Sequence, residues 1–255
     1  MIVTDFLNRK LQIDVIPQRI VSIVPSQTEL LVDLGLERNI LGVTKFCVHP
    51  QRLKSTKTIV GGTKQVHIDK IKTLQPDIIF CNKEENTPEM VEELSKIAPV
   101  HVSDIKTLDD NYKLIEDYAT IFNKASKGNN ILSQLKYKYG IFKNSIKGKP
   151  KLKVAYLIWR EPWMAAGQDT FIHHLLEVNN FENVFAKQNR YPEIDIKNLP
   201  NLDLLLLSSE PYPFKTKHLD DIPIANENIK FVNGEYFSWY GSRMLYAFEY
   251  FNTTF

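Results

Sequence analysis

The segment HIDKIKTLQPDIIFCNKEE at residues 67–85 decides the fold, because a similar segment, EIDIKNLPNLDLLLLSSEP, follows at residues 193–211. One constant offset aligns four identical residues: Ile68 with Ile194, Asp69 with Asp195, Asp77 with Asp203 and Glu84 with Glu210. In both copies a helical spacing leads into a short apolar run that is typical of a buried strand. Two unrelated helix–strand units could share this spacing by chance, but the matching order of units favours an internal repeat.

The chain around these segments alternates between strand and helix signals, which favours a mostly parallel α/β architecture. RIVSIVP at residues 19–25 is a β-branched run, and Ile40–Phe46 and Val100–Val102 are similar strand candidates. After the first run, Ser26 is in position to cap a helix, and Glu29 three residues later completes a capping box.

The strand signals stop between the two copies. From residue 108 to about 147, apolar residues recur every three or four positions, which predicts two helices with a break near Lys127 and Gly128. The second helix, about Asn129–Ile146, is a long amphipathic rod. We therefore predict an α/β protein of two similar lobes with mostly parallel sheets, bridged by one long helix. The expected boundaries are 1–126 for the N-terminal lobe, 127–148 for the linking helix and 149–255 for the C-terminal lobe.

The composition excludes several classes of protein. The 255 residues are 43% hydrophobic and 24% charged, as in a globular domain. With 32 Lys and Arg against 30 Asp and Glu, the net charge of +2 creates no global field that would attract nucleic acid or an anionic membrane. No apolar run approaches the ~20 residues of a membrane-spanning helix. We therefore expect neither nucleic-acid binding nor membrane insertion.

The N-terminus and the cysteines bear on the cellular compartment. Charged residues interrupt positions 1–15, so the uninterrupted apolar stretch of ~7–15 residues that a secretory signal needs is missing. The chain as encoded is therefore expected to stay in the cytoplasm. Cys47 and Cys81 are the only cysteines, which excludes a disulfide framework.

Aromatic residues gather in the loops that follow the predicted strands. Ligands of open parallel sheets bind beyond the carboxyl ends of the strands, and aromatics in such loops either cover the core or line a site for a large flat ligand. We favour the second interpretation, because core aromatics belong in the periodic segments. The predicted ligand-binding residues, with the charged ones orienting the ligand, are Ser26, Gln27, Glu84, Trp159, Trp163, Glu210, Tyr212, Phe237, Trp239 and Arg243.

A metal site in the first lobe is an alternative. Cys47, His49, His67, Cys81 and Glu84 map to strand ends, and nitrogen and sulfur ligands suit zinc or another transition metal. The chain lacks a tight ligand pair such as Cys-x-x-Cys, which makes this the weaker hypothesis. It leaves open a cytoplasmic metal-handling protein, or an α/β enzyme, that uses the Cys47/His49/Cys81/Glu84 cluster.

Enzyme motifs are missing from the sequence. There is no G-x-S-x-G nucleophile elbow and no G-x-G-x-x-G or P-loop, and Gly61-Gly62-Thr63-Lys64 is the nearest approach to a phosphate-binding loop. We therefore expect no catalytic residue, no enzymatic activity and no intrinsic cofactor.

The order of these segments resembles a known family. RIVSIVPSQTELLVDLGL at 19–36, GVTKF at 42–46, the segment from His67 and GEYFSWYGSR at 234–243 are similar to the helical-backbone (class III) substrate-binding proteins of ABC importers. The resemblance is closest to the branch that binds cobalamin and iron chelates, and it runs from about Arg19 to Phe251. It implies two α/β lobes bridged by one long helix, with the ligand in the cleft between them.

The resemblance also implies roles for particular residues. Cobalamin binders of this family hold the corrin plane with cleft aromatics, which suits Trp159, Trp163, Phe237 and Trp239. Where those proteins have an aromatic before the first docking helix, this chain has residues 61–65, GGTKQ.

Family members dock on the permease through one acidic residue from each lobe. The matching positions are Asp69 and Asp195, each expected near the start of a helix and facing solvent. The function implied is that of a monomeric, non-enzymatic binding protein for a cobalamin-like or iron-chelate (siderophore or haem) ligand, with an ABC permease as its partner. The family is periplasmic, in contrast to the compartment that the N-terminus predicts.

Overall fold

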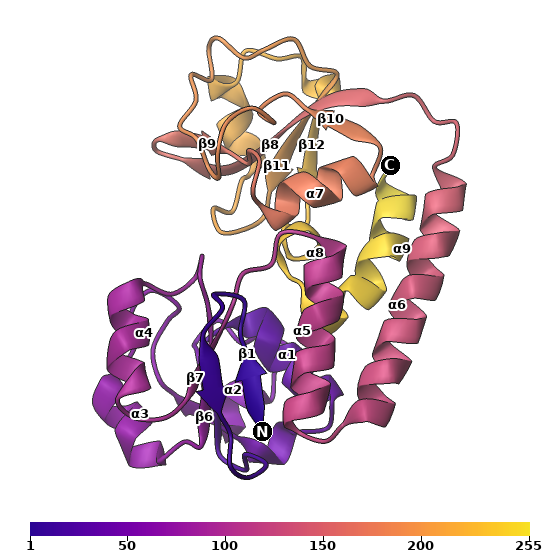
Figure 1. Ribbon diagram of the computed structural model, residues 1–255. Coiled ribbons are helices and arrows are strands. Elements are labelled where there is room, and N and C mark those ends of the chain that lie inside the picture. The colour runs from indigo at the N-terminus through magenta and orange to yellow at the C-terminus, as the bar shows by residue number, and fades with distance from the viewer. The chain divides into compact units, whose positions relative to one another are not determined.

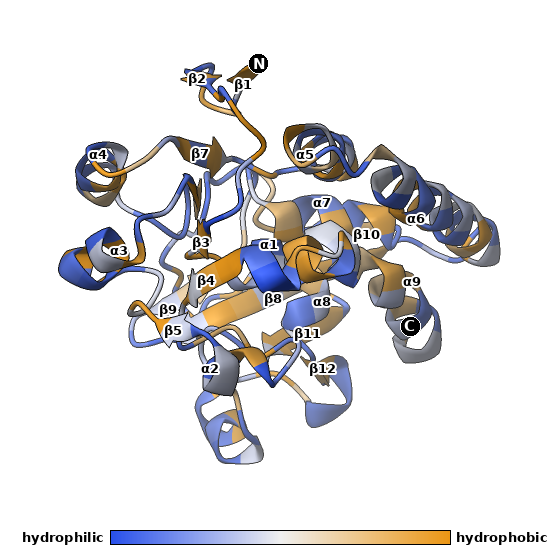
Figure 2. Cartoon of the chain, turned by 90° about the horizontal axis from the view of Figure 1, so that it is seen from below, coloured by the Kyte–Doolittle hydropathy of each residue, from blue (hydrophilic) through white to orange (hydrophobic).

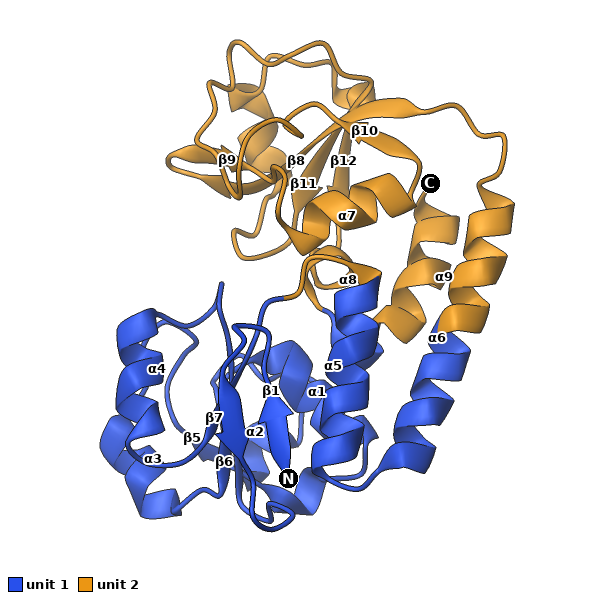
Figure 3. Cartoon of the chain, viewed as in Figure 1, with its two compact units in different colours: residues 1–104, 109–135, 240–243 blue, residues 105–108, 136–239, 244–255 orange.

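A computed structural model describes all residues 1–255 and divides the chain into two compact units (Figures 1 and 3). Unit 1 comprises residues 1–104, 109–135 and 240–243, and unit 2 comprises residues 105–108, 136–239 and 244–255. The short segment 240–243 therefore belongs to unit 1, although its neighbours in sequence belong to unit 2. None of the helices combines the length and the apolar character that crossing a bilayer requires.

Unit 1 contains a five-stranded parallel sheet and its covering helices. The strands follow the order β5-β4-β3-β6-β7, and β1 and β2 form a separate antiparallel pair. The strands are β1 (Ile2–Thr4), β2 (Lys10–Gln12), β3 (Ile20–Ser22), β4 (Ile40–Val43), β5 (Thr58–Ile59), β6 (Ile78–Asn82) and β7 (Val100–Ser103). The helices that begin in this half of the chain are α1 (Pro25–Asp33), α2 (Leu53–Thr56), α3 (Ile68–Leu74), α4 (Pro88–Ser95), α5 (Leu108–Ile121) and α6 (Ala125–Ser145).

Unit 2 repeats the order of four of these strands, β4-β3-β6-β7. Its sheet follows the order β10-β8-β11-β12 with parallel pairing, and β9 adds to β8 as an antiparallel hairpin. Its strands are β8 (Leu152–Arg160), β9 (Trp163–Ala165), β10 (Phe181–Asn183), β11 (Leu204–Ser208) and β12 (Ile229–Val232). Its helices, besides the end of α6, are α7 (Phe171–Val178), α8 (Glu235–Ser238) and α9 (Met244–Thr254). The predicted fold class, an α/β protein with two parallel-sheet lobes, is confirmed.

Two aspartates of the sequence repeat accept equivalent backbone hydrogen bonds in the two sheets. Asp77 precedes β6, and its carboxylate accepts hydrogen bonds from the N–H groups of Gln18 and Arg19, next to the start of β3 (2.8 and 2.9 Å). Asp203 precedes β11, and its carboxylate accepts one from the N–H of Lys153 in β8 (2.7 Å). Each aspartate thus satisfies backbone donors at the amino end of the neighbouring strand, which gives the shared offset a structural reason.

The cores of both units are apolar, as the residues of the central strands predict. In unit 1, Val21, Ile23, Ile79 and Val100 are buried together, and in unit 2 the strands β8 and β11 pack against neighbouring loops. In Figure 2 the ribbon of β8 is orange, whereas α3 and α6 are largely blue to grey. Hydrophobic strands buried on both faces are typical of parallel sheets.

The break between the two long helices lies earlier than predicted. α5 ends at Ile121 and α6 begins at Ala125, and Asn123 adopts a positive φ of 51° in the connection. Gly128, at the predicted break, lies inside α6, where an added Cβ would be 2.5 Å from the Cβ of Ala119. The glycine allows α5 and α6 to pack closely and does not interrupt the helix.

The predicted capping box at the start of the first helix is also wrong. α1 begins at Pro25 with Val24 at the N-cap position, and no side chain caps it. Proline fixes the first turn, since its missing N–H would have no partner there. Ser26 and Glu29 therefore lie within the helix, and both are buried.

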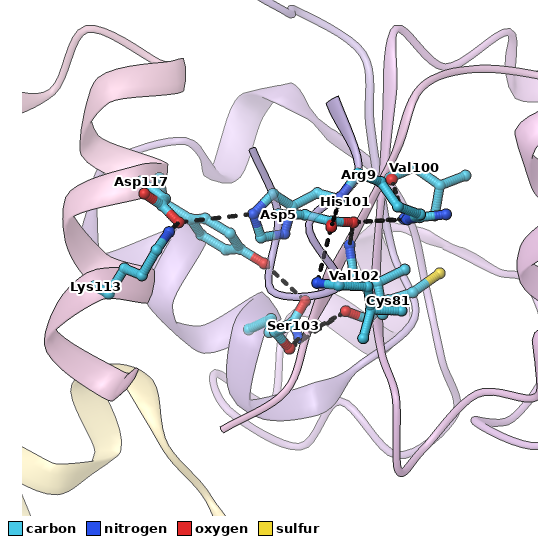
Figure 4. A network of polar contacts seen from close by, with 12 residues as sticks. Asp5, Arg9, Cys81, Val100, His101, Val102, Ser103, Lys113 and Asp117 are labelled. Atoms are coloured by element: carbon cyan, nitrogen blue, oxygen red, sulfur yellow. Dashed lines mark hydrogen bonds and ion pairs between the residues drawn. The ribbon is translucent and has the colours of Figure 1, made fainter. Parts of the chain in front are cut away.

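The N-terminal segment covers the edge strand β7 of unit 1 (Figure 4). The Asp5 carboxylate accepts hydrogen bonds from the Val102 N–H (3.2 Å) and from the Arg9 guanidinium (2.7 and 2.9 Å). Arg9 in turn donates to the Val100 carbonyl (2.7 Å). A charged, hydrogen-bonded segment satisfies backbone groups that an edge strand would otherwise offer to another chain.

His101 lies on β7 beneath this segment and is fully buried. Its ring contacts Phe6, Phe80 and Tyr118, and neither ring nitrogen makes a hydrogen bond. Burial lowers the pKa of His101 from its ordinary 6.5 to about 4. The nearby Asp5 opposes this shift, and Lys113 and Arg9 add to it. The remaining charged neighbour, Asp117 on α5, lies 4.0 Å from Nε2. The imidazole is therefore neutral in the folded protein at pH 7.

We predict that unit 1 loses stability as the pH falls through the range between these two pKa values. Below pH 6.5 His101 is protonated in the unfolded chain but stays neutral in the folded chain until the pH approaches 4. The free energy of unfolding should therefore fall by roughly 2 kcal/mol between pH 7 and pH 5. Urea denaturation of the wild type and of His101→Asn at both pH values measures this. The variant should be less sensitive to pH, and equal sensitivity of the two proteins would contradict the prediction.

Candidate ligand-binding site

The β8–β9 hairpin of unit 2 carries an aromatic cluster at the carboxyl end of its sheet. Trp159 near the end of β8 packs edge-on against Tyr212, with ring centroids 5.6 Å apart. Trp163 on β9 stacks on Phe214, with centroids 5.9 Å apart and planes 15° from parallel. Tyr212 and Phe214 also contact each other (4.9 Å). The hairpin and the loop after β11 thus bring together Trp159, Trp163 and Tyr212, three of the residues that the sequence predicts.

Two residues that the sequence did not single out hold this cluster. The Arg160 guanidinium lies 5.8 Å from the centre of the Trp163 ring and pairs with Glu161 and Asp221 (2.5 and 2.6 Å). Nδ1 of His218 accepts a hydrogen bond from the Lys215 N–H (3.0 Å), so the proton of the neutral ring is on Nε2. Nε2 then donates to the Tyr212 hydroxyl (3.2 Å). Burial lowers the pKa of His218, which favours this neutral form.

The two tryptophan side chains of the cluster, Trp159 and Trp163, differ in how much of their surface is exposed to solvent. Trp163 is half-buried between its contacts with Phe214 and Arg160. Trp159 is 40% exposed, although its Nε1 donates to the Glu161 carbonyl (3.2 Å) and its ring contacts Tyr212. A large aromatic surface left in water at a strand end is the feature expected of a contact for a flat apolar ligand. Trp159 is therefore the ring of the cluster best placed to stack on a ligand.

Phe237 requires a correction. It is fully buried in the core of unit 2, with its ring 5.0 Å from Tyr156 and 4.8 Å from Phe251. The single turn of α8 directs it inward, so it has no surface for a ligand. Trp239, one residue after α8, is also buried, at 8% exposure. Glu210 accepts a hydrogen bond from the Ser238 hydroxyl (2.7 Å), which ties the loop after β11 to α8.

Gln27 requires the same correction in unit 1. Its side-chain amide donates to Ser103 Oγ (2.6 Å) and to the Tyr240 hydroxyl (3.0 Å), and its carbonyl oxygen accepts from the Tyr118 hydroxyl (2.7 Å). The amide thus links α1, β7, α5 and the 240–243 segment. Gln27 is fully buried and Ser26 is 4% exposed, so both are structural in unit 1.

Arg243 is likewise buried, and it pairs with Glu29 of α1. Its Nε lies 2.9 Å from one carboxylate oxygen and its Nη2 lies 2.7 Å from the other. The Nε contact is a charge-assisted hydrogen bond, and the Nη2 contact is an ion pair. The predicted role of Arg243 in orienting a ligand is therefore replaced by a role in holding the 240–243 segment within unit 1.

The carboxyl edge of unit 1 contains an aromatic residue that the sequence analysis missed. Phe46 follows β4, is 49% exposed, and has the Lys45 ammonium 5.1 Å from its ring centre. It lies against the loop at residues 61–66, where Gly61 has a φ of 126° and Gly62 leaves room for the Phe46 ring. Its position directly after a strand, beside the glycine pair, was a signal that could have identified it.

Half-buried Glu84 lies at the same edge of unit 1, in the loop after β6. The Asn82 side chain accepts hydrogen bonds from the N–H groups of Glu84 and Glu85 (2.8 and 3.2 Å), which shapes this loop. Lys64 donates to the Glu84 carbonyl, and the Asn86 amide donates to the Thr63 carbonyl (2.7 Å). The loops after β5 and β6 are thus joined into one polar surface.

The hypothetical metal cluster does not form. No group of three His, Cys, Asp or Glu side chains in the chain is arranged to hold a metal ion. Cys47 is buried and contacts the hydroxyls of Thr28 and Thr44 (3.3 and 3.4 Å), and burial raises the pKa of its thiol. Cys81 lies in the apolar core, where burial likewise raises its pKa. Neutral buried thiols are poor metal ligands, and His49 and His67 lie in loops outside this core.

The two predicted docking acids face solvent, but only one begins a helix. Asp69 lies in the first turn of α3, and its side chain is fully exposed. Asp195 lies in a turn, where its carboxylate accepts hydrogen bonds from the Lys197 N–H (2.9 Å) and the Asn198 amide (2.5 Å). The Lys197 N–H is the main reason that the pKa of Asp195 lies below its ordinary value. Pro200 follows too soon for this turn to extend into a helix.

Comparison with known proteins identifies the family. Residues 20–209 match the family described as periplasmic binding protein. The chain belongs to this family. It is 22% identical to the vitamin B12-binding protein of Pectobacterium carotovorum over 240 residues, which is 91% of this chain and 86% of the relative. The predicted resemblance to class III substrate-binding proteins is confirmed, and so is the non-enzymatic character of the family.

Solved structures of periplasmic binding proteins share the fold. The vitamin B12 binding protein BtuF of Vibrio cholerae superposes with a TM-score of 0.81 at 19% identity, covering 94% of this chain and 96% of that one. A periplasmic heme binding protein from Pseudomonas aeruginosa gives 0.77 at 20% identity, covering 94% and 92%. At these identities the likeness concerns the fold alone.

We predict that Arg243→Met lowers the free energy of unfolding by roughly 3–5 kcal/mol, because the buried Glu29 carboxylate loses its guanidinium. The double variant Glu29→Met/Arg243→Met should recover most of this loss, since it removes both charges. Urea denaturation of the two single variants, Arg243→Met and Glu29→Met, and of the double variant measures the coupling. A double variant as unstable as the sum of the two single variants would show that the pair does not interact.

Proposed function

We propose that this periplasmic binding protein family member serves an ABC importer and binds a large flat metal chelate, either cobalamin-like or an iron chelate such as haem or a ferric siderophore. The observation that carries the proposal is the exposed Trp159 indole, held by Tyr212 at the carboxyl end of the unit 2 sheet. Relatives named for vitamin B12 and heme support the same class of ligand. We place the protein, like those relatives, outside the cytoplasm.

The chemistry of the two sheet edges supports a chelate rather than a small polar solute. On unit 2 the exposed indole of Trp159 offers a flat aromatic contact, and on unit 1 the exposed ring of Phe46 offers another, and a flat macrocycle suits contacts of this kind. Lys45 and Lys64 lie at the edge of unit 1, where cations suit anionic groups on the rim of a chelate. A sugar or amino acid would leave most of this aromatic surface in water.

Titration with three ligands tests the ligand class. Purified protein should shift the absorption spectrum of cyanocobalamin, haemin or a ferric siderophore at micromolar protein concentrations. Binding of one ligand identifies the class, since the three spectra are distinct. Failure of all three to bind would contradict the proposal.

We predict that Trp159→Ala weakens binding of that ligand by about 2–4 kcal/mol, or roughly 30- to 700-fold. The free energy of unfolding should change less than on loss of a fully buried indole, because Trp159 is 40% exposed. Phe231→Ala is a matched control, since Phe231 is 42% exposed on the edge strand β12. Equal affinity of Trp159→Ala and wild type, measured by the same titration, would exclude Trp159 as a ligand contact.

We also propose that Asp69 and Asp195 meet basic residues of the permease. The equal offset in the repeat and the exposure of both side chains support this role. A favourable interaction of Asp69 with the amino end of α3, worth about 0.3–1 kcal/mol, could by itself explain an acid at that position. Asp195 has no such helix, so that explanation does not extend to both residues.

We predict that Asp69→Lys/Asp195→Lys abolishes uptake in cells where the wild-type protein supports it, while ligand affinity stays within twofold. The reason is that like charges would face each other at the permease. Asp33→Lys/Glu227→Lys is the control, because it reverses one exposed acid in each unit and gives the same net charge. Normal uptake by the Asp69/Asp195 variant, or equal loss in the control, would contradict the docking role.

A further inference from the structure

The positive charges of this chain are not evenly distributed. From Tyr118 to Arg160 there is no Asp or Glu, whereas nine lysines lie in this stretch, so all 30 acidic residues lie elsewhere. The stretch includes α6 and the segment that leads into β8. A near-zero net charge therefore conceals one strongly basic part of the surface.

The contacts of α6 determine which of its faces is exposed in unit 2. Phe142 is buried against Phe248 and Phe251 of α9, and Tyr139 also contacts Phe248. On the opposite side, Tyr137 is 71% exposed and Ile141 is 52% exposed. Between them, a Cβ added to Gly140 would meet no atom within 4 Å. The solvent face of α6 therefore presents an aromatic and an aliphatic side chain one turn apart.

Lysines flank this apolar pair. At 100° per residue, Lys136 and Lys143 lie on one side of Tyr137 and Ile141. Lys138 lies on the other side, half-buried, and its ammonium donates to the Leu245 carbonyl of α9 (2.8 Å). Lys147, Lys149 and Lys151 continue past the end of the helix, and all three are exposed. Lys143, Lys147, Lys149 and Lys151 form no ion pair. We call this surface, residues 136–151, the basic face.

We propose that the basic face binds the surface of a bilayer that contains anionic lipids. Clustered lysines on an amphipathic helix are attracted to anionic headgroups, and Tyr and Ile side chains at its centre can enter the boundary between headgroups and acyl chains. A nucleic acid offers phosphates to the lysines but no apolar layer for Ile141. The absence of arginine in residues 118–159 also argues against bidentate phosphate or base recognition. The full chain would thus lie on a membrane, without inserting a helix through it.

Vesicle binding with matched lysine variants tests this proposal. The wild type should co-sediment with vesicles of 30% phosphatidylglycerol in phosphatidylcholine, but not with pure phosphatidylcholine, and 500 mM salt should release it. Lys143→Gln/Lys147→Gln/Lys149→Gln should weaken binding by about a hundredfold. The control Lys187→Gln/Lys197→Gln/Lys217→Gln removes three exposed lysines of the same unit and should bind within about threefold of wild type. Circular dichroism establishes that both variants are folded.

A second variant separates the apolar contribution from the charge. Tyr137→Ser/Ile141→Ser keeps every lysine and should still lose at least tenfold in affinity for anionic vesicles. Three results would overturn the proposal. These are failure of the wild type to bind anionic vesicles at 50 mM salt, equal loss in the two lysine variants, and binding of a DNA or RNA duplex that prevents binding to vesicles. None of these measurements depends on the ligand of the importer.

Discussion

Parallel strand pairing is the constraint on which the rest of this molecule depends. In each unit it sends the connections between the parallel strands back through a helix or loop, so the carboxyl ends of the central strands share one edge of the sheet. In unit 2 that edge holds Trp159, Trp163 and Tyr212, and in unit 1 it holds Phe46 and Glu84. The chemistry of these residues follows from their position after strands.

The aspartates that precede β6 and β11 extend this constraint. Each accepts backbone hydrogen bonds at the amino end of the neighbouring central strand, at Arg19 in one unit and Lys153 in the other. Two strands joined in this way are held side by side at their start, where Ile20 pairs with Ile78 and Val154 with Leu204. The identical offset of Asp77 and Asp203 in the sequence is therefore a structural requirement of the repeated sheet.

How much the sequence could predict depended on the range of the interactions. Local patterns predicted central strands, the two mostly parallel sheets and the aromatic residues at strand ends, because apolar runs and strand-end position are properties of neighbouring residues. The roles of Gln27 and Arg243 could not be predicted, since their partners Tyr240 and Glu29 lie more than 200 positions away. Phe237 was misassigned for a similar reason. The core that covers it is completed by Tyr156 and Phe251, and a loop position alone does not show this.

The distribution of charge separates two kinds of surface that net charge cannot distinguish. Asp69 and Asp195 are exposed acids at matching places in a repeat, and α6 carries exposed lysines around Tyr137 and Ile141. Charges that exist only for solubility are expected to be mixed in sign along an exposed helix, since like charges at short spacing repel. The solvent face of α6 keeps that repulsion and leaves two apolar side chains in water as well. Repulsion between lysines and exposure of apolar side chains both destabilise this surface in water. A partner that is anionic and apolar at once would relieve both, and the interface of a lipid bilayer has these two properties.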